Sequence, residues 1–333
     1  MERFRFNIIK RTKLWFILSL LIILPGLVSI GVQGFNLGID FTGGTIMDVS
    51  FEEPVSVEQV RDVMARHGLG NSVIQLATEE GQTTSKDAMI RTPVLSEEAR
   101  SAVAADLKES IGNFEIKRVE LVGSVVGEEL TMNAIVAVLI SWVLIVLYIA
   151  YRFEFTFGIA AIGSLLHDVL VVLGVFSLLQ YEIDSAFIAA ILTVVGYSIN
   201  DTIVIFDRIR ENLKLRRRGG RYEELVEDSL WQTMTRSIYT SVTVLVCVLS
   251  LYFFGGETTK GFALALTIGM FIGAYSSIFN AAPVWVILAN RKDKRRLTNR
   301  DNAPKKEKEK ESSKDKKQPK DEHDASSWLK DEV

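Results

Sequence analysis

Six long apolar stretches are the feature that most restricts how this chain can fold. Each is close to the roughly 20 residues that an α-helix needs to cross the hydrocarbon core of a membrane. The stretches cover residues 14–34, 131–151, 157–180, 185–206, 234–254 and 262–289. Charged residues make up 24% of the chain, yet nearly all of them lie outside these stretches. This segregation predicts a polytopic α-helical membrane protein with six transmembrane helices.

The basic residues between the stretches predict the orientation. The N-terminal arm, residues 1–13, holds five basic side chains, and the loop 207–232 holds seven. The tail that follows the helical region 131–290 also opens with a basic cluster. Basic loops stay on the cytoplasmic side, so both termini are predicted to be cytoplasmic.

The segment 35–130, between the first and second predicted helices, has the pattern of a folded α+β domain outside the cytoplasm. Residues 45–51 alternate as a strand does. Ser56 and Ser96 are positioned to cap two amphipathic helices, and Gly68 and Gly112 follow those helices. With three further short strands, the order becomes βαββαβ, the ferredoxin-like or split βαβ arrangement. This fold carries no chemistry of its own.

The tail, residues 291–333, is rich in Lys, Glu and Asp, and it is predicted to be disordered and cytoplasmic. It serves either as a solubilising segment or as an electrostatic contact with partners or anionic membrane lipid.

Several classes of function are disfavoured. The single cysteine, Cys247, allows no intrachain disulfide, and the three histidines are scattered, so no metal site is expected. The chain has no nucleotide-binding glycine motif and no HExxH motif. We therefore expect no cofactor and no nucleic-acid partner, and none of these motifs indicates enzymatic activity. Any work done by the chain then relies on an ion gradient, or the chain uses no energy input at all.

Two acidic residues lie within predicted transmembrane helices. A charged carboxylate deep in a membrane costs at least about 2.5–3.5 kcal/mol, so such a residue usually faces a partner or a water-filled path. Asp201 has the polar neighbours Asn200 and Thr202, which favours a functional role. Asp168 has either such a role or only an interhelical hydrogen bond that holds helices together.

Arg236 begins the fifth predicted helix. A basic residue there often extends its side chain to the lipid headgroups. However, Asp201 lies about 22 Å below the outer end of its own helix, and Arg236 lies at the cytoplasmic beginning of its helix. Both residues therefore fall in the inner third of the membrane. An Asp201–Arg236 pair is therefore geometrically feasible. In the last helix, Gly269 and Gly273 form a GxxxG pattern that allows close helix packing.

Four stretches together resemble the SecF family, accessory subunits of the bacterial Sec preprotein translocase and relatives of the resistance–nodulation–division transporters. They are FNLGIDFTGGT (35–45), GYSINDTIVIFDRIREN (196–212), TRSIYTSVTVL (235–245) and GAYSSIFNAAP (273–283). The resemblance extends over the chain to about residue 295.

The resemblance implies a late step of protein export that is driven by the proton gradient, or by sodium in some members. It implies SecD as the partner, at a SecYEG translocon with SecA on the cytoplasmic side and preproteins as substrates. The ion-coupling residues of the family map onto Asp201 and Arg236. The family's structural motif maps onto four residues of the first stretch: Gly38, Asp40, Gly43 and Gly44.

Two other functions remain open at this point. One is half of a small-molecule or lipid exporter of the same superfamily. The other is an intramembrane aspartyl hydrolase that uses Asp168 and Asp201, although neither residue has the GxGD context of such enzymes.

Overall fold

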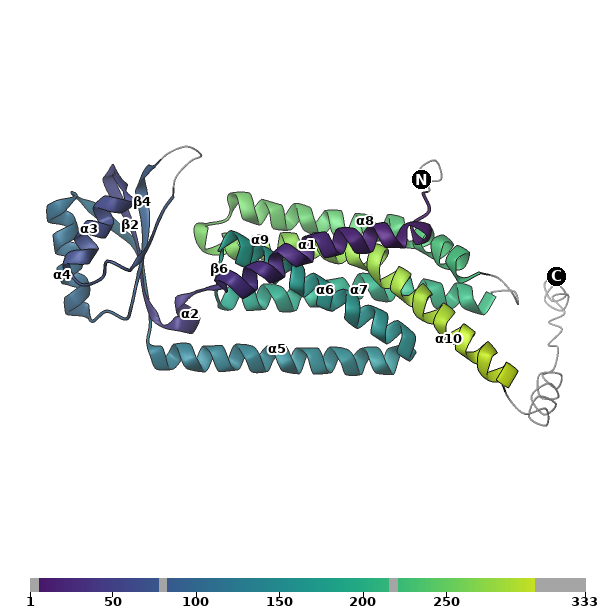
Figure 1. Cartoon of the computed structure of the whole chain (residues 1–333). Coiled ribbons are helices and arrows are strands. Elements are labelled where there is room, and N and C mark those ends of the chain that lie inside the picture. The colour runs from purple at the N-terminus through teal and green to yellow at the C-terminus, as the bar shows by residue number, and fades with distance from the viewer. Residues whose placement is uncertain (1–5, 78–82, 216–220, 303–333) are drawn as a thin grey trace, which may run out of the picture. The chain divides into compact units, whose positions relative to one another are not determined.

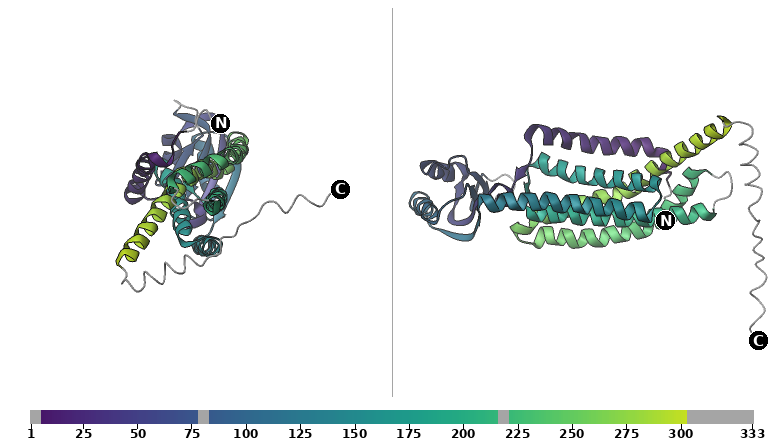
Figure 2. Two further views of the ribbon diagram at one scale, coloured as in Figure 1. Left: turned by 90° about the vertical axis from the view of Figure 1, so that its right-hand side faces the viewer. Right: turned by 90° about the horizontal axis from the view of Figure 1, so that it is seen from below.

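The computed structural model describes residues 6–77, 83–215 and 221–302. Within these residues, six helices are long and apolar enough to cross a membrane, as predicted. They are α1 (Thr12–Gln33), which follows a 3₁₀ turn (Ile9–Arg11), α5 (Ser124–Arg152), α6 (Phe155–Leu179), α7 (Ser185–Leu215), α8 (Tyr222–Phe254) and a final helix that begins as α9 (Glu257–Ser276). Helices α1 and α5 to α9 run roughly side by side (Figures 1 and 2).

The last spanning helix is not a regular α-helix throughout. A π-helical turn, η3 (Ser277–Ala281), separates α9 from α10 (Ala282–Asn302). Residues 291–302 are therefore helical, which corrects the prediction of disorder for that part of the tail. The residues are helix formers such as Lys, Arg and Leu, and Pro304 is the first proline or glycine after the span. Residues 303–333 of the predicted tail lie outside the described part of the chain.

The predicted loop 207–232 is also mostly helical. Helix α7 continues to Leu215 and α8 begins at Tyr222, so the polar residues of this segment extend the two spanning helices. Basic residues 216–218 of the loop lie outside the described residues. In the same way, α5 begins at Ser124, inside the segment assigned to the exported domain.

A sheet domain lies between α1 and α5. Its elements follow the predicted βαββαβ order: β2 (Gly44–Ser56), α3 (Val57–Arg66), β3 (Val73–Leu76), β4 (Thr84–Thr92), α4 (Glu97–Ser110) and β5 (Phe114–Val122). The strands are antiparallel in the order β3-β4-β2-β5, so β4 lies between the two strands that α3 connects. This placement is the one that a split βαβ arrangement requires.

Both domain helices begin at the predicted serines. The Ser56 hydroxyl accepts a hydrogen bond from the Gln59 N–H (3.3 Å), while the Gln59 side chain accepts one from the Ser56 N–H (2.8 Å). At α4 the Ser96 hydroxyl accepts a hydrogen bond from the Ala99 N–H (3.3 Å) without a reciprocal side-chain bond. The helices cover one face of the sheet, where Val60, Met64 and Leu107 pack with buried strand residues. The domain therefore has a hydrophobic core of its own.

The glycine-rich motif joins this domain to the spanning helices. After α1, the chain forms β1 (Asn36–Leu37), which pairs in parallel with β6 (Glu182–Ile183) between α6 and α7. The short helix α2 (Ile39–Thr42) follows. A Cβ at Gly38 would lie 2.7 Å from Glu182 Oε1, and one at Gly44 would lie 2.7 Å from the Thr92 carbonyl oxygen. At Gly44 the close group is backbone, so there is no room for a side chain; at Gly38 the Glu182 carboxylate would have to move aside.

Two close helix contacts depend on glycine as well. Helix α1 packs on α6 where Gly26 faces Gly174, with a built Cβ on Gly26 only 2.6 Å from the Gly174 Cα. Helix α9 packs on α7 through its GxxxG face, where Gly269 meets Val194 and Gly273 meets Ser198. The last contact brings α9 next to the polar residues of α7.

Candidate functional site

Asp201 lies in α7, sixteen residues beyond Ser185, or about 24 Å along the helix at 1.5 Å per residue. Its Oδ1 atom accepts a hydrogen bond from the Ser237 hydroxyl of α8 at 2.6 Å. Its Oδ2 atom is buried and has no hydrogen-bond partner among the described residues. A buried polar atom without a partner is costly, so the carboxylate has an unused binding capacity inside the membrane.

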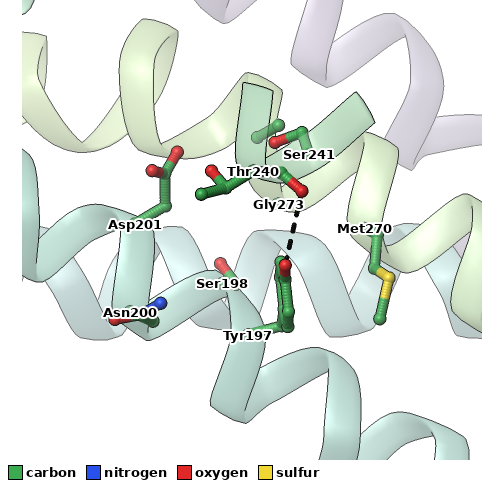
Figure 3. Close-up of a pocket in the computed structure, with 9 residues that line it drawn as sticks. Tyr197, Ser198, Asn200, Asp201, Thr240, Ser241, Met270 and Gly273 are labelled. Carbon is green, nitrogen blue, oxygen red and sulfur yellow. Dashed lines mark hydrogen bonds between the residues drawn. The ribbon is translucent and has the colours of Figure 1, made fainter. Parts of the chain in front are cut away.

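A small pocket adjoins this carboxylate (Figure 3). Residues of three helices line it: from α7, Tyr197, Ser198, Asn200 and Asp201; from α8, Thr240 and Ser241; and from α9, Met270, Gly273 and Ala274. The Tyr197 hydroxyl donates to the Thr240 carbonyl oxygen at 3.4 Å. The volume is about 10 Å³, roughly the space that one water molecule needs. The pocket therefore has the size and polarity to bring a water molecule or a small ion to Asp201.

Arg236 immediately precedes the serine that bonds Asp201. Its side chain is exposed on the surface of the chain, and it donates no hydrogen bond to the carboxylate, because Oδ1 bonds Ser237 and Oδ2 has no partner in the described structure. The sequence predicts that the arginine and the acid are close enough to pair. The structure places them on adjacent helices with Ser237 as the direct link.

The neighbours of Asp201 point in different directions. Asn200 lines the pocket and is exposed. Thr202 is buried away from it and bonds the Ser277 hydroxyl at 2.8 Å and the Ser198 carbonyl oxygen at 3.2 Å. Thr202 therefore holds α7 against η3 and does not face the pocket.

Asp168 has a very different environment. It is completely buried near the middle of α6. His167 Nδ1 lies 2.9 Å from its Oδ1, and the hydroxyls of Ser198 and Ser276 donate to its Oδ2 at 2.5 and 2.8 Å. The carboxylate thus connects α6 with α7 and α9. Because Ser198 also lines the pocket, Asp168 helps to fix one wall of it.

Ser237, Thr240 and Ser241 were not predicted as site residues. Their spacing of three and four residues places them on one face of α8. This spacing is the signal in the sequence that could have identified them as a group. Hydroxyl residues are common near helix ends, however, and only the packing of α8 on α7 shows that this face meets Asp201.

Comparison with known proteins identifies the family. The model described as "Protein export membrane protein SecD/SecF, C-terminal" matches residues 102–291, and the model described as "SecD/SecF GG Motif" matches residues 28–55. The protein translocase subunit SecF of Acidaminococcus fermentans is 48% identical over 85% of this chain and 97% of its own length. The chain belongs to the SecD/SecF family. This confirms the resemblance that the four sequence stretches indicated.

A second relative of the SecD/SecF family is much longer than this chain. The protein translocase subunit SecDF of Thermus thermophilus is 42% identical over 78% of this chain but only 35% of its own length. The crystal structure of a SecDF from the same organism matches with a TM-score of 0.78 and 40% identity, covering 86% of this chain and 39% of that one. The fold described above is therefore that of the SecF-like portion of such a protein.

Proposed function

We propose that this chain is the SecF subunit of a Sec protein-export system in the bacterial cytoplasmic membrane. The observation that carries this proposal is its similarity to the translocase subunit SecF over nearly the full length of that relative. The SecYEG translocon, SecA and preproteins are accordingly the proposed partners and substrates.

We also propose that Asp201 couples ion movement to export, with the proton as the ion and sodium as the alternative. Burial favours a neutral carboxyl group, whereas a nearby guanidinium favours an ionised one. A shift of α8 relative to α7 would change the Ser237 bond and the distance to Arg236 together, since both residues lie on α8. Such a shift would alter the proton affinity of Asp201. In the proposed cycle, the pocket opens alternately to the two sides of the membrane, and the proton affinity changes with each opening.

The surface around this site supports a SecD partner. Five polar or charged side chains are exposed on the membrane-spanning parts of α7 and α8: Thr193, Asn200, Arg236, Tyr239 and Thr240. Polar and charged side chains facing lipid are costly, so a further protein surface is expected to cover them. In the SecDF relative, the portion beyond this chain belongs to the same polypeptide. A SecD-like partner is thus the proposed cover.

The two carboxylates do not form the shared site that an aspartyl hydrolase needs. Asp168 is occupied by His167, Ser198 and Ser276, whereas Asp201 bonds Ser237. Enzymes of that kind bind one catalytic water between two carboxylates. The arrangement supports a transport subunit in preference to a hydrolase.

Depletion of the chain tests the assigned role. Precursors of exported proteins should accumulate, and plasmid-borne wild-type chain should restore their export. The chain should also copurify with a SecD-like membrane protein. Normal precursor processing after full depletion would contradict the proposal.

Cysteine labelling tests the orientation, with both termini and the α7–α8 connection proposed to be cytoplasmic. The native Cys247 is exposed, so it is first replaced by serine. Ser85→Cys in the sheet domain should then react with a membrane-impermeant reagent in intact spheroplasts. Lys214→Cys, at the end of α7, should react only after lysis. Labelling of both positions from the same side would contradict the six-span topology.

A further inference from the structure

One arginine of the sheet domain reaches into the junction with the spanning helices. Arg91 of β4 has a side chain that is only 10% exposed, and its guanidinium forms an ion pair with Glu182 of β6. The same guanidinium donates to Asn36 Oδ1 at 3.3 Å and to the Leu37 carbonyl oxygen at 3.4 Å. A single side chain therefore connects the sheet with the exit of α1 and with the α6–α7 turn.

The α6–α7 turn is also the beginning of the helix that carries Asp201. Asp40 Oδ2 accepts a hydrogen bond from the Ser185 N–H at 2.9 Å, and Asp184 Oδ1 accepts one from the Phe187 N–H at 2.7 Å. These carboxylates satisfy N–H groups in the first turn of α7 and interact favourably with its dipole. The Gly38 N–H donates to the Ile183 carbonyl oxygen at 2.8 Å. The first turn of α7 is thus tied to the glycine-rich motif.

The charges at this junction depend on Arg91. Burial raises the pKa of Glu182 above its ordinary value, Arg91 lowers it, and the carboxylates of Asp184 and Asp40 raise it further. The guanidinium therefore offsets both the burial of Glu182 and the repulsion among three acidic groups. Its removal would take away the ion-pair partner of Glu182, with the more weakly acting Arg118 as the other positive charge that lowers the pKa of that carboxyl group.

Elsewhere, the uncovered face of the sheet does not pack tightly on the turn. A cleft of about 890 Å³ separates sheet residues such as Ile46, Met89 and Arg118 from Tyr181 and Asp184. Beside this open space, the Arg91–Glu182 ion pair joins the sheet directly to the turn, whereas the β1–β6 pairing joins the turn to the segment that precedes the sheet.

We propose that the Arg91–Glu182 pair is a positioning contact that transmits movement of α7 to the exported sheet domain. This rests on the proposed function, in which ion binding at Asp201 displaces α7 relative to α8. Helix α7 extends without a break from Ser185 to Asp201, so a displacement at the ion site moves its first turn as well. Arg91 holds the sheet to that turn, and the sheet follows.

The test uses the full chain with its partner in membrane vesicles, in a Cys247→Ser background. Spin labels at Lys86→Cys in β4 and Thr258→Cys in α9 report the distance between the sheet domain and the spanning helices. Both positions are exposed, so labels can be attached without disturbing a core. The parent should give a narrow distance distribution that shifts when the gradient is applied.

Arg91→Ala should broaden the distribution, remove its gradient-dependent shift and lower export by roughly an order of magnitude. Glu182→Gln keeps the size of the side chain and should have the same effects in weaker form. It is the test variant to use if Arg91→Ala is not stably folded. Arg100→Ala is the matched control, because Arg100 pairs with Glu97 of its own helix, α4, and not with the junction, and it should behave like the parent.

An unchanged distance distribution in both junction variants would show that the pair does not position the domain. A broadened distribution with full export would show that positioning by this pair is not used in transport, and would leave the role of Asp201 intact. If Asp201→Asn also exported normally, the proposed function itself would fail, whatever the distances.

Discussion

Replacing Asp201 by asparagine is expected to abolish gradient-dependent export while the chain still inserts and binds its partner. The asparagine carbonyl oxygen can accept the Ser237 hydrogen bond that Oδ1 accepts now. Asparagine also has nearly the same size and shape, so the packing of α7 on α8 should be retained. The amide cannot bind and release a proton at neutral pH, so only the coupling step is removed. The measurement is precursor transport into vesicles with and without an imposed gradient.

Three matched variants separate this effect from a loss of folding. Asp201→Glu keeps an ionisable group and should retain part of the gradient response. Arg236→Ala should be nearly as damaging as Asp201→Asn, and Arg236→Lys should restore little, because lysine is a poor substitute for a permanently charged guanidinium. Asp168→Asn keeps one oxygen acceptor but sets its amide N–H₂ either against His167 Nδ1 or against the hydroxyls of Ser198 and Ser276, so it should mainly lower the amount of folded chain.

Full export by Asp201→Asn would end the coupling proposal. If instead the activity of every variant followed the amount of intact complex, both acidic residues would act only as helix contacts.

Replacing Gly269 by valine is expected to prevent α9 from packing on α7 and to remove most of the folded protein. A Cβ at Gly269 would lie 2.2 Å from Val194 Cγ2 and 2.6 Å from Cγ1, far inside van der Waals contact. Valine side chains are stiff in helices, so Val194 cannot rotate away easily. Overpacking of this kind typically costs about 1–3 kcal/mol, and more where backbones must separate. The measurement is the yield and thermal stability of the detergent-solubilised, monodisperse chain.

The structure provides both a rescue and a control for this variant. Gly269→Ala should be destabilised as well, and adding Val194→Ala should restore much of the loss, because it removes the two atoms that clash. Gly261→Ala lies in the same helix with nothing within 4 Å of its Cβ position, and it should be tolerated. Equal stability of Gly269→Val and Gly261→Ala would contradict the close contact between α9 and α7.

Any folded Gly269 variant should also be impaired in export. One turn further along α9, Gly273 packs on Ser198, with a built Cβ 3.1 Å from the Ser198 Cβ. Ser198 bonds Asp168 and lines the Asp201 pocket, so a displaced α9 changes the wall of the proposed ion site.

Local patterns were sufficient to predict the elements of this protein. Membrane-spanning helices are specified by about 20 consecutive apolar residues, which is a property of each segment alone. The capping box of Ser56 and Gln59 likewise acts within one turn, so its outcome is visible in the sequence. Patterning did not reveal that α7 and α8 extend beyond the membrane, because polar helix formers in that connection suit a loop and a solvated helix equally well.

Only the tertiary structure showed how the surroundings of the two acidic residues of the membrane differ. The sequence by itself determined that both Asp168 and Asp201 lie within spanning helices, where a charge is costly. What differs is the number of hydrogen-bond donors that other helices bring to each carboxylate. Asp168 meets donors from α6, α7 and α9, whereas Asp201 meets one from α8 and keeps a free oxygen beside a pocket.

The same holds for the glycine-rich motif. Its residues predict a sharp turn, yet Asp40 caps a helix that begins 145 residues later, and Arg91 binds Glu182 across a separation of 91 residues. Contacts between residues so far apart in the chain depend on how the helices and the sheet pack. No local pattern contains that information, and the packing therefore decided both the surroundings of Asp201 and the contacts between the first turn of α7 and the sheet domain.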